Sequence, residues 1–143
     1  MPTLPEIPKV SAALGLPTSV RTPADLDQAV RAGLPYRSLV RLAKRFGEGN
    51  AARVYRLVAP RQTLKRREAA GRLKPDESER LERLARLLAL AEQVWESEER
   101  ARGFMTAPHP RLDHRSPLEL AATELGARRV EELLWNLEYS LPV

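Results

Sequence analysis

A basic stretch near the middle of the chain has the residue types that recognise DNA. It has the sequence PRQTLKRREAAGRL over residues 60–73, so a proline precedes the run of helix-compatible residues and a glycine closes it. If Leu64 faces inward, the helical rotation of 100° per residue turns Gln62, Arg66 and Ala69 outward. Gln and Arg side chains distinguish adenine and guanine edges, while Lys and Arg suit phosphates. The candidate DNA-contacting residues are Arg61, Gln62, Thr63, Lys65, Arg66 and Arg67.

The segments around this stretch have the layout of a helix-turn-helix motif. Such a motif needs two short helices and a tight turn, with polar side chains on the second helix. Residues 51–58, AARVYRLV, form the expected first helix, and Ala59-Pro60 forms the turn. A solvated basic helix in an ordinary bundle has the same pattern, so these residues alone leave both interpretations open.

The C-terminal stretch ARRVEELLWNLEYSLPV, residues 127–143, has features of a partner-binding helix. One apolar stripe consists of Val130, Leu133, Leu134 and Leu137. Trp135 and Tyr139 form a second stripe, rotated by about 100°. A helix that is apolar on two sides is buried on both or meets a partner, and Trp and Tyr are favoured at interfaces. Alternatively, Trp135 packs on Trp95 inside the domain, and the tail after Tyr139 frays instead of entering a partner's cleft.

Composition excludes several classes of function. The chain has 143 residues and no cysteine, so disulfides, thiolate zinc sites and cysteine nucleophiles are excluded. His109, Asp113 and His114 lie in one loop without a second ligand cluster, so a metal site is not expected. We expect neither an enzyme nor a cofactor, because no catalytic ordering of Ser, His and Asp and no phosphate-cradling glycine loop is evident. No segment resembles a membrane span or a signal peptide, so a soluble cytoplasmic protein is expected.

The charge is divided unevenly along the chain. Residues 1–75 contain 15 Lys and Arg against 5 Asp and Glu, and residues 76–143 contain 9 against 14. Only the first half, with a net charge of +10, has the electrostatic character of a nucleic-acid binder. The difference indicates two separate roles, unless it is only chance variation in solvated surface charge.

The apolar residues recur at intervals of three and four, which predicts an all-α fold. We expect a small helical bundle with a helix-turn-helix, joined through a long helix to a C-terminal helical domain. The expected segments are an extended or disordered arm at 1–20, a helix-turn-helix DNA-binding domain at 21–75 and a second helical domain at 76–143. The expected helices span 22–33, 36–47, 51–58, 61–71, 76–97, 98–108, 116–126 and 127–139, with Gly126 ending the seventh.

The order of several short motifs resembles the antitoxins of the Xre/MbcA/ParS group. A Thr-Leu-x-Arg-Arg element is matched by Thr63, Leu64, Arg66 and Arg67, and a Leu-x-Pro-x-Glu-Ser element by Leu73, Pro75, Glu77 and Ser78. Later elements are matched by Ala101, Phe104, Met105 and Pro108, by Pro117, Leu118 and Leu120, and by Gly126, Val130, Leu133 and Leu134. The chain departs from the family at Val58, where the turn often has glycine, and at Phe104, where the family usually has Trp.

The resemblance implies an antitoxin that binds a cognate RES-domain toxin, an enzyme that consumes NAD, and that represses its own operon by binding operator DNA as a homodimer. It implies that residues 76–143 form the toxin-binding domain, and it places the toxin-contacting region at the C-terminal end. The candidate toxin-binding residues are Phe104, Arg128, Glu131, Trp135, Glu138, Tyr139, Leu141 and Val143. Two alternatives remain at this point: a stand-alone Xre-family transcriptional regulator whose C-terminal half only dimerises, and a helical interaction module without a DNA role.

Overall fold

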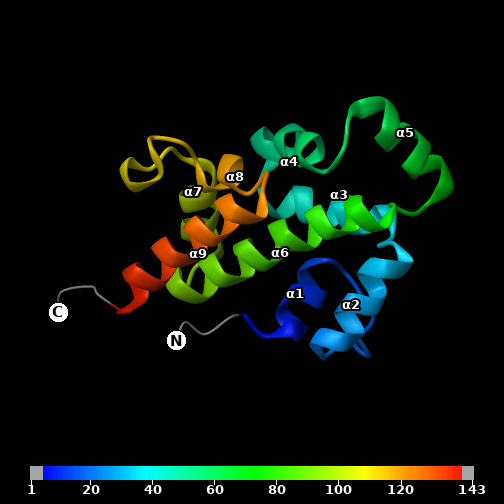
Figure 1. Ribbon diagram of the computed structural model, residues 1–143, viewed down its shortest axis with the longest axis horizontal. Helices are drawn as coiled ribbons and strands as arrows, with labels where there is room; N and C mark the ends of the chain where they lie inside the picture. The colour runs from blue at the N-terminus through cyan, green and yellow to red at the C-terminus, as the bar shows by residue number, and fades with distance from the viewer. Residues whose placement is uncertain (1–4, 140–143) are drawn as a thin grey trace. The chain divides into compact units, whose positions relative to one another are not determined.

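The computed structural model describes residues 5–139, and over this range the chain is all-α, as expected. Nine α-helices and two short 3-10 helices occur in these residues, and no strand does (Figure 1). The helices are α1 (Ile7–Ala13), α2 (Pro23–Ala32), α3 (Tyr36–Arg45), α4 (Ala51–Val58), α5 (Arg61–Ala70), α6 (Pro75–Trp95), α7 (Glu98–Thr106), α8 (Pro117–Leu120) and α9 (Glu124–Tyr139). The 3-10 helices are η1 (Glu48–Asn50) and η2 (Pro110–Leu112).

The chain packs as two compact units, and the division between them falls inside α6, between Ala85 and Arg86. Residues 6–85 form the N-terminal unit, and 86–139 are the described helical part of the C-terminal unit. The sequence placed the boundary at the start of α6, because Pro75 and the acidic residues after it mark a helix start. These signals locate the beginning of a helix. They do not show where along the helix the packing changes from one unit to the other.

The expected extended arm at 1–20 is wrong for the part that the structure describes. Residues 7–13 form α1, and Val10 and Leu14 are fully buried. Pro8 is compatible with this helix because it lies in the first turn, where a backbone N–H has no partner within the helix. The hydroxyl of Ser11 donates to the carbonyl of Val20, which ties α1 to the following loop. The N-terminal segment is therefore a part of the core, starting at α1.

Local signals fix the ends of the helices that carry the N-terminal unit. Thr22 caps α2 in a capping box with Asp25, and Gly33 ends the helix with φ of +92°. A Cβ at residue 33 would lie 2.3 Å from the carbonyl oxygen of Leu73, so only glycine fits there. Asn50 does not cap α4 with its side chain, and instead its amide donates to the carbonyl of Phe46. The tight approach at Gly33 brings the α2–α3 connection against the segment that follows α5.

The C-terminal unit contains one helix boundary that differs from expectation. Ser116 forms the expected capping box with Glu119, but α8 ends at Leu120 and α9 already begins at Glu124. Gly126 therefore lies in the first turn of α9 instead of ending a helix. A Cβ at residue 126 would be 1.8 Å from the carbonyl oxygen of Leu120, so this glycine serves a close backbone contact. Glycine thus brings the start of α9 against the end of α8.

None of the helices in the described range combines the length and the apolar character that crossing a membrane requires.

Candidate DNA-binding and partner-binding sites

The connection between α4 and α5 forms a short extended turn that needs no glycine. Val58 is the last residue of α4 and is fully buried, and Ala59 and Pro60 are both extended, with φ of −167° and −61°. Val58 itself is still helical and does not have a positive φ, so a valine is compatible with this position. The side chain of Leu64 is buried, as the sequence analysis expected for the inward-facing residue of α5.

Contacts at both ends of α5 fix its orientation within the N-terminal unit. Near its start, Arg80 of α6 donates to the carbonyl oxygen of Val58 at 2.7 Å, which anchors the turn. Beyond its end, the N–H of Leu73 donates to the carbonyl of Leu34 at 2.8 Å. Ser78 of α6 accepts a hydrogen bond from the N–H of Leu34 at 2.7 Å. A helix held by neighbours on both sides presents its outer face in a fixed direction, which base recognition requires.

Arg67 has a different role from the phosphate contact expected of it. Its Nε donates to Oε1 of Glu77 at 2.7 Å, and the same carboxylate oxygen accepts from the N–H of Lys74 at 2.9 Å. Only 17% of the Arg67 side chain and 6% of the Glu77 side chain are exposed. Burial raises the pKa of Glu77, but the hydrogen bonds from Arg67 and Lys74 and the Arg67 charge outweigh it, so the net pKa lies below the usual value. Arg67 therefore joins α5 to α6 as one member of a half-buried ion pair.

This ion pair gives a physical reason for two of the sequence motifs. Arg67 belongs to the Thr-Leu-x-Arg-Arg element, and Glu77 and Ser78 belong to the Leu-x-Pro-x-Glu-Ser element. Glu77 accepts from Arg67 and Ser78 accepts from Leu34, so the two motifs lock α5 against the beginning of α6. Sequence reasoning missed the structural roles of Glu77 and Arg80. The place of Glu77 in the Leu-x-Pro-x-Glu-Ser element was a signal for it, whereas Arg80 belongs to neither motif.

The remaining candidate residues of α5 lie on its outer face. Arg61, Gln62, Lys65 and Arg66 are exposed, and Thr63 is half-buried. The guanidinium of Arg66 lies 3.4 Å from the hydroxyl of Thr63, a long contact that leaves most of its donors directed elsewhere. The structure thus brings together five of the six candidates on one side of α5 and assigns the sixth, Arg67, to the interior side.

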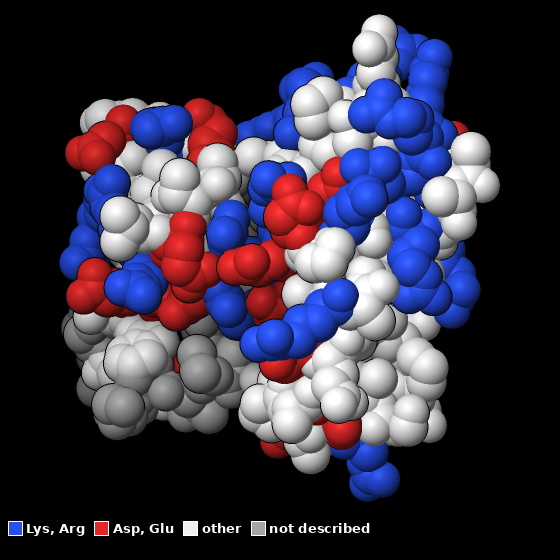
Figure 2. Space-filling view, turned by 45° about the vertical axis from the view of Figure 1, so that its right-hand side comes forward, with Lys and Arg blue, Asp and Glu red and all other residues white. Residues whose placement is uncertain are grey.

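The N-terminal unit carries the excess of positive charge. Residues 6–85 contain 17 Lys and Arg against 9 Asp and Glu, whereas residues 86–143 contain 7 against 10. In Figure 2 basic side chains cover much of the visible surface of the N-terminal unit, while acidic and basic side chains are mixed on the C-terminal unit. Positive charge and the exposed face of α5 therefore occur in the same unit, as a DNA-binding surface requires.

In the C-terminal unit, Arg86 holds α9 against the second half of α6. Its guanidinium lies 3.3 Å from Glu124 and 3.4 Å from Glu131, two carboxylates on α9. Burial raises the pKa of Glu131; Arg86 opposes this, and the Glu124 carboxylate adds to it. Glu131 was expected to contact a toxin, but its carboxylate pairs with Arg86 inside the unit, where it helps to position α9.

Phe104 also makes internal contacts. Its ring lies 6.0 Å from the ring of Trp95 and 6.1 Å from that of His109, measured between centroids. These tilted and edge-on arrangements are favourable for aromatic pairs. Phe104 is half-buried, so it joins the end of α6 to the loop before α8 and offers only part of its ring to solvent. In the described range no group of three or more His, Cys, Asp or Glu side chains could hold a metal ion.

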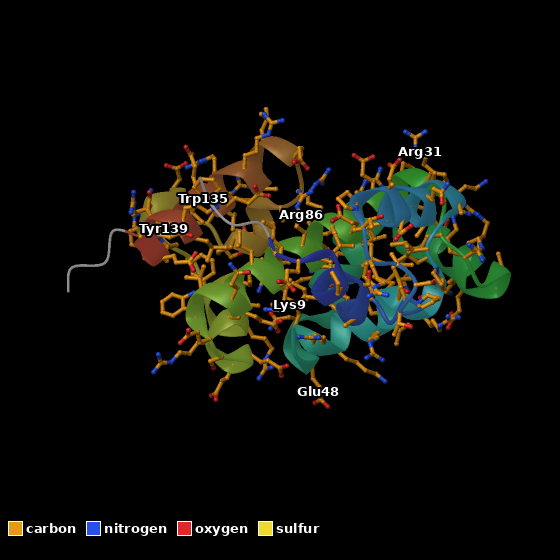
Figure 3. All side chains as sticks on the ribbon, turned by 90° about the horizontal axis from the view of Figure 1, so that it is seen from below. Lys9, Arg31, Glu48, Arg86, Trp135 and Tyr139 are labelled. Carbon is orange, nitrogen blue, oxygen red and sulfur yellow. The ribbon has the colours of Figure 1, made fainter. Side chains whose placement is uncertain are left out.

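The C-terminal end of α9 presents the remaining candidates for partner binding. Trp135 and Tyr139 lie at this end (Figure 3), where Trp135 is half-buried and 62% of Tyr139 is exposed. Arg128 is exposed on the first half of the helix. Among the described residues, the indole N–H of Trp135 and Oε2 of Glu138 are buried without a hydrogen-bond partner. Such groups are uncommon in isolated folded domains and call for an explanation. Leu141 and Val143 lie outside the described residues.

Two models of protein domains match the chain, one on each unit. Residues 25–86 match the antitoxin Xre-like helix-turn-helix domain, and residues 90–139 match the antitoxin Xre/MbcA/ParS C-terminal toxin-binding domain. The chain belongs to the Xre/MbcA/ParS family of antitoxins. The first match contains α4, the turn and α5, and the second contains α7, α8 and α9.

Two curated relatives of this antitoxin family member are each named antitoxin Xre. The protein from Yersinia enterocolitica is 35% identical over 85 residues, which cover 59% of this chain and 57% of the relative. The protein from Pseudomonas putida is 35% identical over 81 residues, which cover 56% of this chain and 51% of the relative. The chain therefore matches a little over half the length of these relatives. The family is one of regulatory binding proteins and not of enzymes.

Proposed function

We propose that this chain is the antitoxin of a type II toxin-antitoxin system, which neutralises a RES-type toxin that consumes NAD and represses its own operon. The observation that carries the proposal is the match of a helix-turn-helix model to the basic unit and of a toxin-binding model to the following unit. The two activities accordingly divide between residues 6–85 and residues 86–143. Because the chain acts on DNA and on an enzyme that uses NAD, it works in the cytoplasm.

The DNA-binding part of the proposal is supported by the geometry of α5. Gln62 and Arg66 lie on its exposed face, suited to base edges in the major groove, and Lys65 and Arg61 flank them, suited to phosphates. The helix is held at both ends by α6 and the α2–α3 connection. A homodimer would place two such helices on a two-fold symmetric operator, which lies upstream of the antitoxin gene.

The toxin-binding part is supported by the end of α9. Tyr139 is exposed, and Trp135 is half-buried one turn before it on the same helix. Aromatic side chains that are already ordered by their own unit are effective anchors at interfaces. We propose that α9 docks on the toxin and that the following residues, including Leu141 and Val143, obstruct the toxin's active site. A segment tethered to a docked helix has a high effective concentration at a nearby pocket.

Binding and inhibition can be separated experimentally. The chain lacking residues 140–143 should bind the toxin nearly as well as the full chain but should inhibit NAD consumption less. Tyr139→Ala in the full chain should lower affinity and inhibition together, because it removes a docking contact. Both affinities and both residual activities are measured on the same purified toxin. Unchanged inhibition by the shortened chain would reject obstruction by the tail and would leave steric blocking by the folded unit.

The choice between an antitoxin and a stand-alone regulator rests on a co-purification experiment. The chain and the product of the reading frame next to its gene are expressed together, with an affinity tag on that product only. An antitoxin should be retained in stoichiometric amount through washing at high salt, which removes weak electrostatic contacts. A chain that binds DNA but is not retained would instead be a regulator whose C-terminal unit only dimerises.

A further inference from the structure

The exposed side of α3 carries three basic residues that neither the helix-turn-helix layout nor the resemblance assigns to DNA. Arg37, Arg41 and Lys44 are exposed and lie at intervals of four and three residues, so they form one stripe on the helix. At a rise of about 1.5 Å per residue the stripe is about 10 Å long. A single strand of duplex DNA presents about three phosphates over this length, because its charges are about 3.4 Å apart along the axis.

The stripe borders a hollow that reaches α5. This hollow, of about 660 Å³, is lined by Arg37, Arg41 and Lys44 from α3, by Glu68 from α5 and by Gly71, which follows α5. Arg41 is partly fixed there, because its Nε donates to the carbonyl of Ala12. The stripe and the C-terminal half of α5 are therefore two walls of one depression within the same unit.

A second hollow extends the same surface toward the start of α5. Its volume is about 500 Å³, and Arg56, Arg61 and Lys65 contribute the basic side chains of its lining. Tyr36 and Glu68 line both hollows, so they form the divide between them. The Tyr36 hydroxyl can donate to an anion, because a phenol is protonated near neutral pH. Burial, with the Glu68 carboxylate nearby, raises its pKa further. The positive charges of α3, α4 and α5 thus border two neighbouring depressions that share Tyr36 and Glu68.

We propose that the α3 stripe, through Arg37 and Lys44 with Arg41 between them, binds the sugar-phosphate backbone of duplex DNA beside the site that α5 contacts. The inference rests on the proposed DNA-binding role of α5 and extends it to a second helix. The sugar-phosphate backbone carries no sequence information, so contacts from the stripe to it strengthen binding to every sequence equally. Glu68, which lies between the two groups of cations, opposes the nearby phosphates and limits this sequence-independent affinity.

The test measures how DNA affinity depends on salt. The full chain and its variants are titrated onto two 24-base-pair duplexes of unrelated sequence, at several salt concentrations between 50 and 200 mM, by fluorescence anisotropy. The test variant is the double substitution Arg37→Gln with Lys44→Gln, which leaves Arg41 and its contact with Ala12 in place. The matched control is Lys9→Gln with Arg31→Gln, exposed residues of α1 and α2 in the same unit that line neither hollow (Figure 3).

Each phosphate contact contributes about 0.9 to the slope of log affinity against log salt. In the α3 double variant, the magnitude of this slope should therefore be smaller by about 1.8 on both duplexes. Between 50 and 200 mM salt, the factor by which its affinity falls should be about tenfold smaller than for the wild-type chain. The control variant, which removes the same net charge, should keep the slope of the wild-type chain. Glu68→Gln should raise affinity for both duplexes, because it removes a carboxylate beside the bound phosphates.

Three outcomes would overturn the inference, and they differ from one another. If the α3 variant keeps the full slope while Lys65→Ala loses about 0.9, α5 binds DNA and α3 does not. If the control loses as much slope as the α3 variant, net charge and not the stripe determines binding. If the wild-type chain itself shows no salt-dependent binding to either duplex or to the DNA upstream of its gene, the proposed DNA-binding function fails as well.

Discussion

Glu77→Ala should destabilise the N-terminal unit without removing a DNA contact. The substitution removes a carboxylate that is only 6% exposed and that accepts from Arg67 Nε at 2.7 Å and from the N–H of Lys74 at 2.9 Å. Exposed ion pairs contribute at most about 1 kcal/mol, while breaking a buried pair costs about 3–5 kcal/mol. This pair lies between the two classes, so we expect Glu77→Ala to lower the free energy of unfolding by about 2–3 kcal/mol.

The assay combines thermal unfolding with the salt dependence of DNA binding. At about 4 °C per kcal/mol, the melting temperature should fall by about 8–12 °C for Glu77→Ala. Arg67→Ala should also lower it, and neither variant should change the salt slope under conditions where the protein is folded. Lys65→Ala is the matched control on the exposed face of α5, and it should keep the melting temperature and lose about 0.9 of slope. A normal melting temperature with a reduced slope for Arg67→Ala would refute the internal role of Arg67.

The same ion pair makes a prediction about pH. The pKa of Glu77 is lower in the folded protein than its usual value of 4.5, so the charged carboxylate stabilises the fold above that pH. This contribution is lost as the pH falls through the folded pKa. The difference in stability between wild type and Glu77→Gln should therefore be largest near neutral pH and shrink below about pH 4.5. A difference that stays constant from pH 7 to pH 3 would show that the charge of Glu77 contributes nothing.

Three further predictions concern single residues. Gln62→Ala should cost about 1–3 kcal/mol at the cognate operator and relax base choice, as gel shifts with single-base operator variants would show; unchanged selectivity would remove Gln62 from the recognition surface. Gly126→Ala should lower the stability of the C-terminal unit by about 1–3 kcal/mol in urea unfolding, because its Cβ collides with the carbonyl of Leu120. Trp135→Ala should weaken toxin binding by about 2 kcal/mol or more in calorimetry. Leu125→Ala, which truncates an apolar residue that is 72% exposed near the start of α9, is the comparison.

Much of the helical framework could be predicted from local signals. Thr22 and Ser116 form capping boxes, and Gly33 and Gly71 end α2 and α5 with positive φ, because these effects depend only on residues close in sequence. Leu64, which the sequence analysis took as the inward-facing residue of α5, is buried, so the outward direction of Gln62 and Arg66 derived from it agrees with the structure. The sequence analysis missed α1 because nearby prolines weaken the helical pattern. The helix is stabilised instead by the burial of Val10 and Leu14 in the N-terminal unit, which the local sequence does not show.

Features that depend on distant partners could not be predicted in the same way. On α5 alone, Arg67 is one more basic residue, and only its proximity to Glu77 of α6 shows that it faces inward. Likewise, the sequence presents Gly126 as a helix terminator, while the structure shows that it is required by the backbone of Leu120. Phe104 belongs to a family motif, and Glu131 follows Val130 of another. The contact of Phe104 with Trp95 and that of Glu131 with Arg86 depend on how α7 and α9 pack against α6, which the local sequence does not show.

The most direct test of the proposed function is NAD consumption by the partner protein with and without this chain. The product of the adjacent reading frame is purified alone and as the co-expressed complex, and the loss of NAD is followed at equal enzyme concentration. An antitoxin should abolish NAD consumption at a stoichiometric ratio, and the Trp135→Ala variant should require a large excess to do so. A stable complex that consumes NAD at the rate of the free enzyme, or an enzyme that the chain fails to bind, would contradict the proposal.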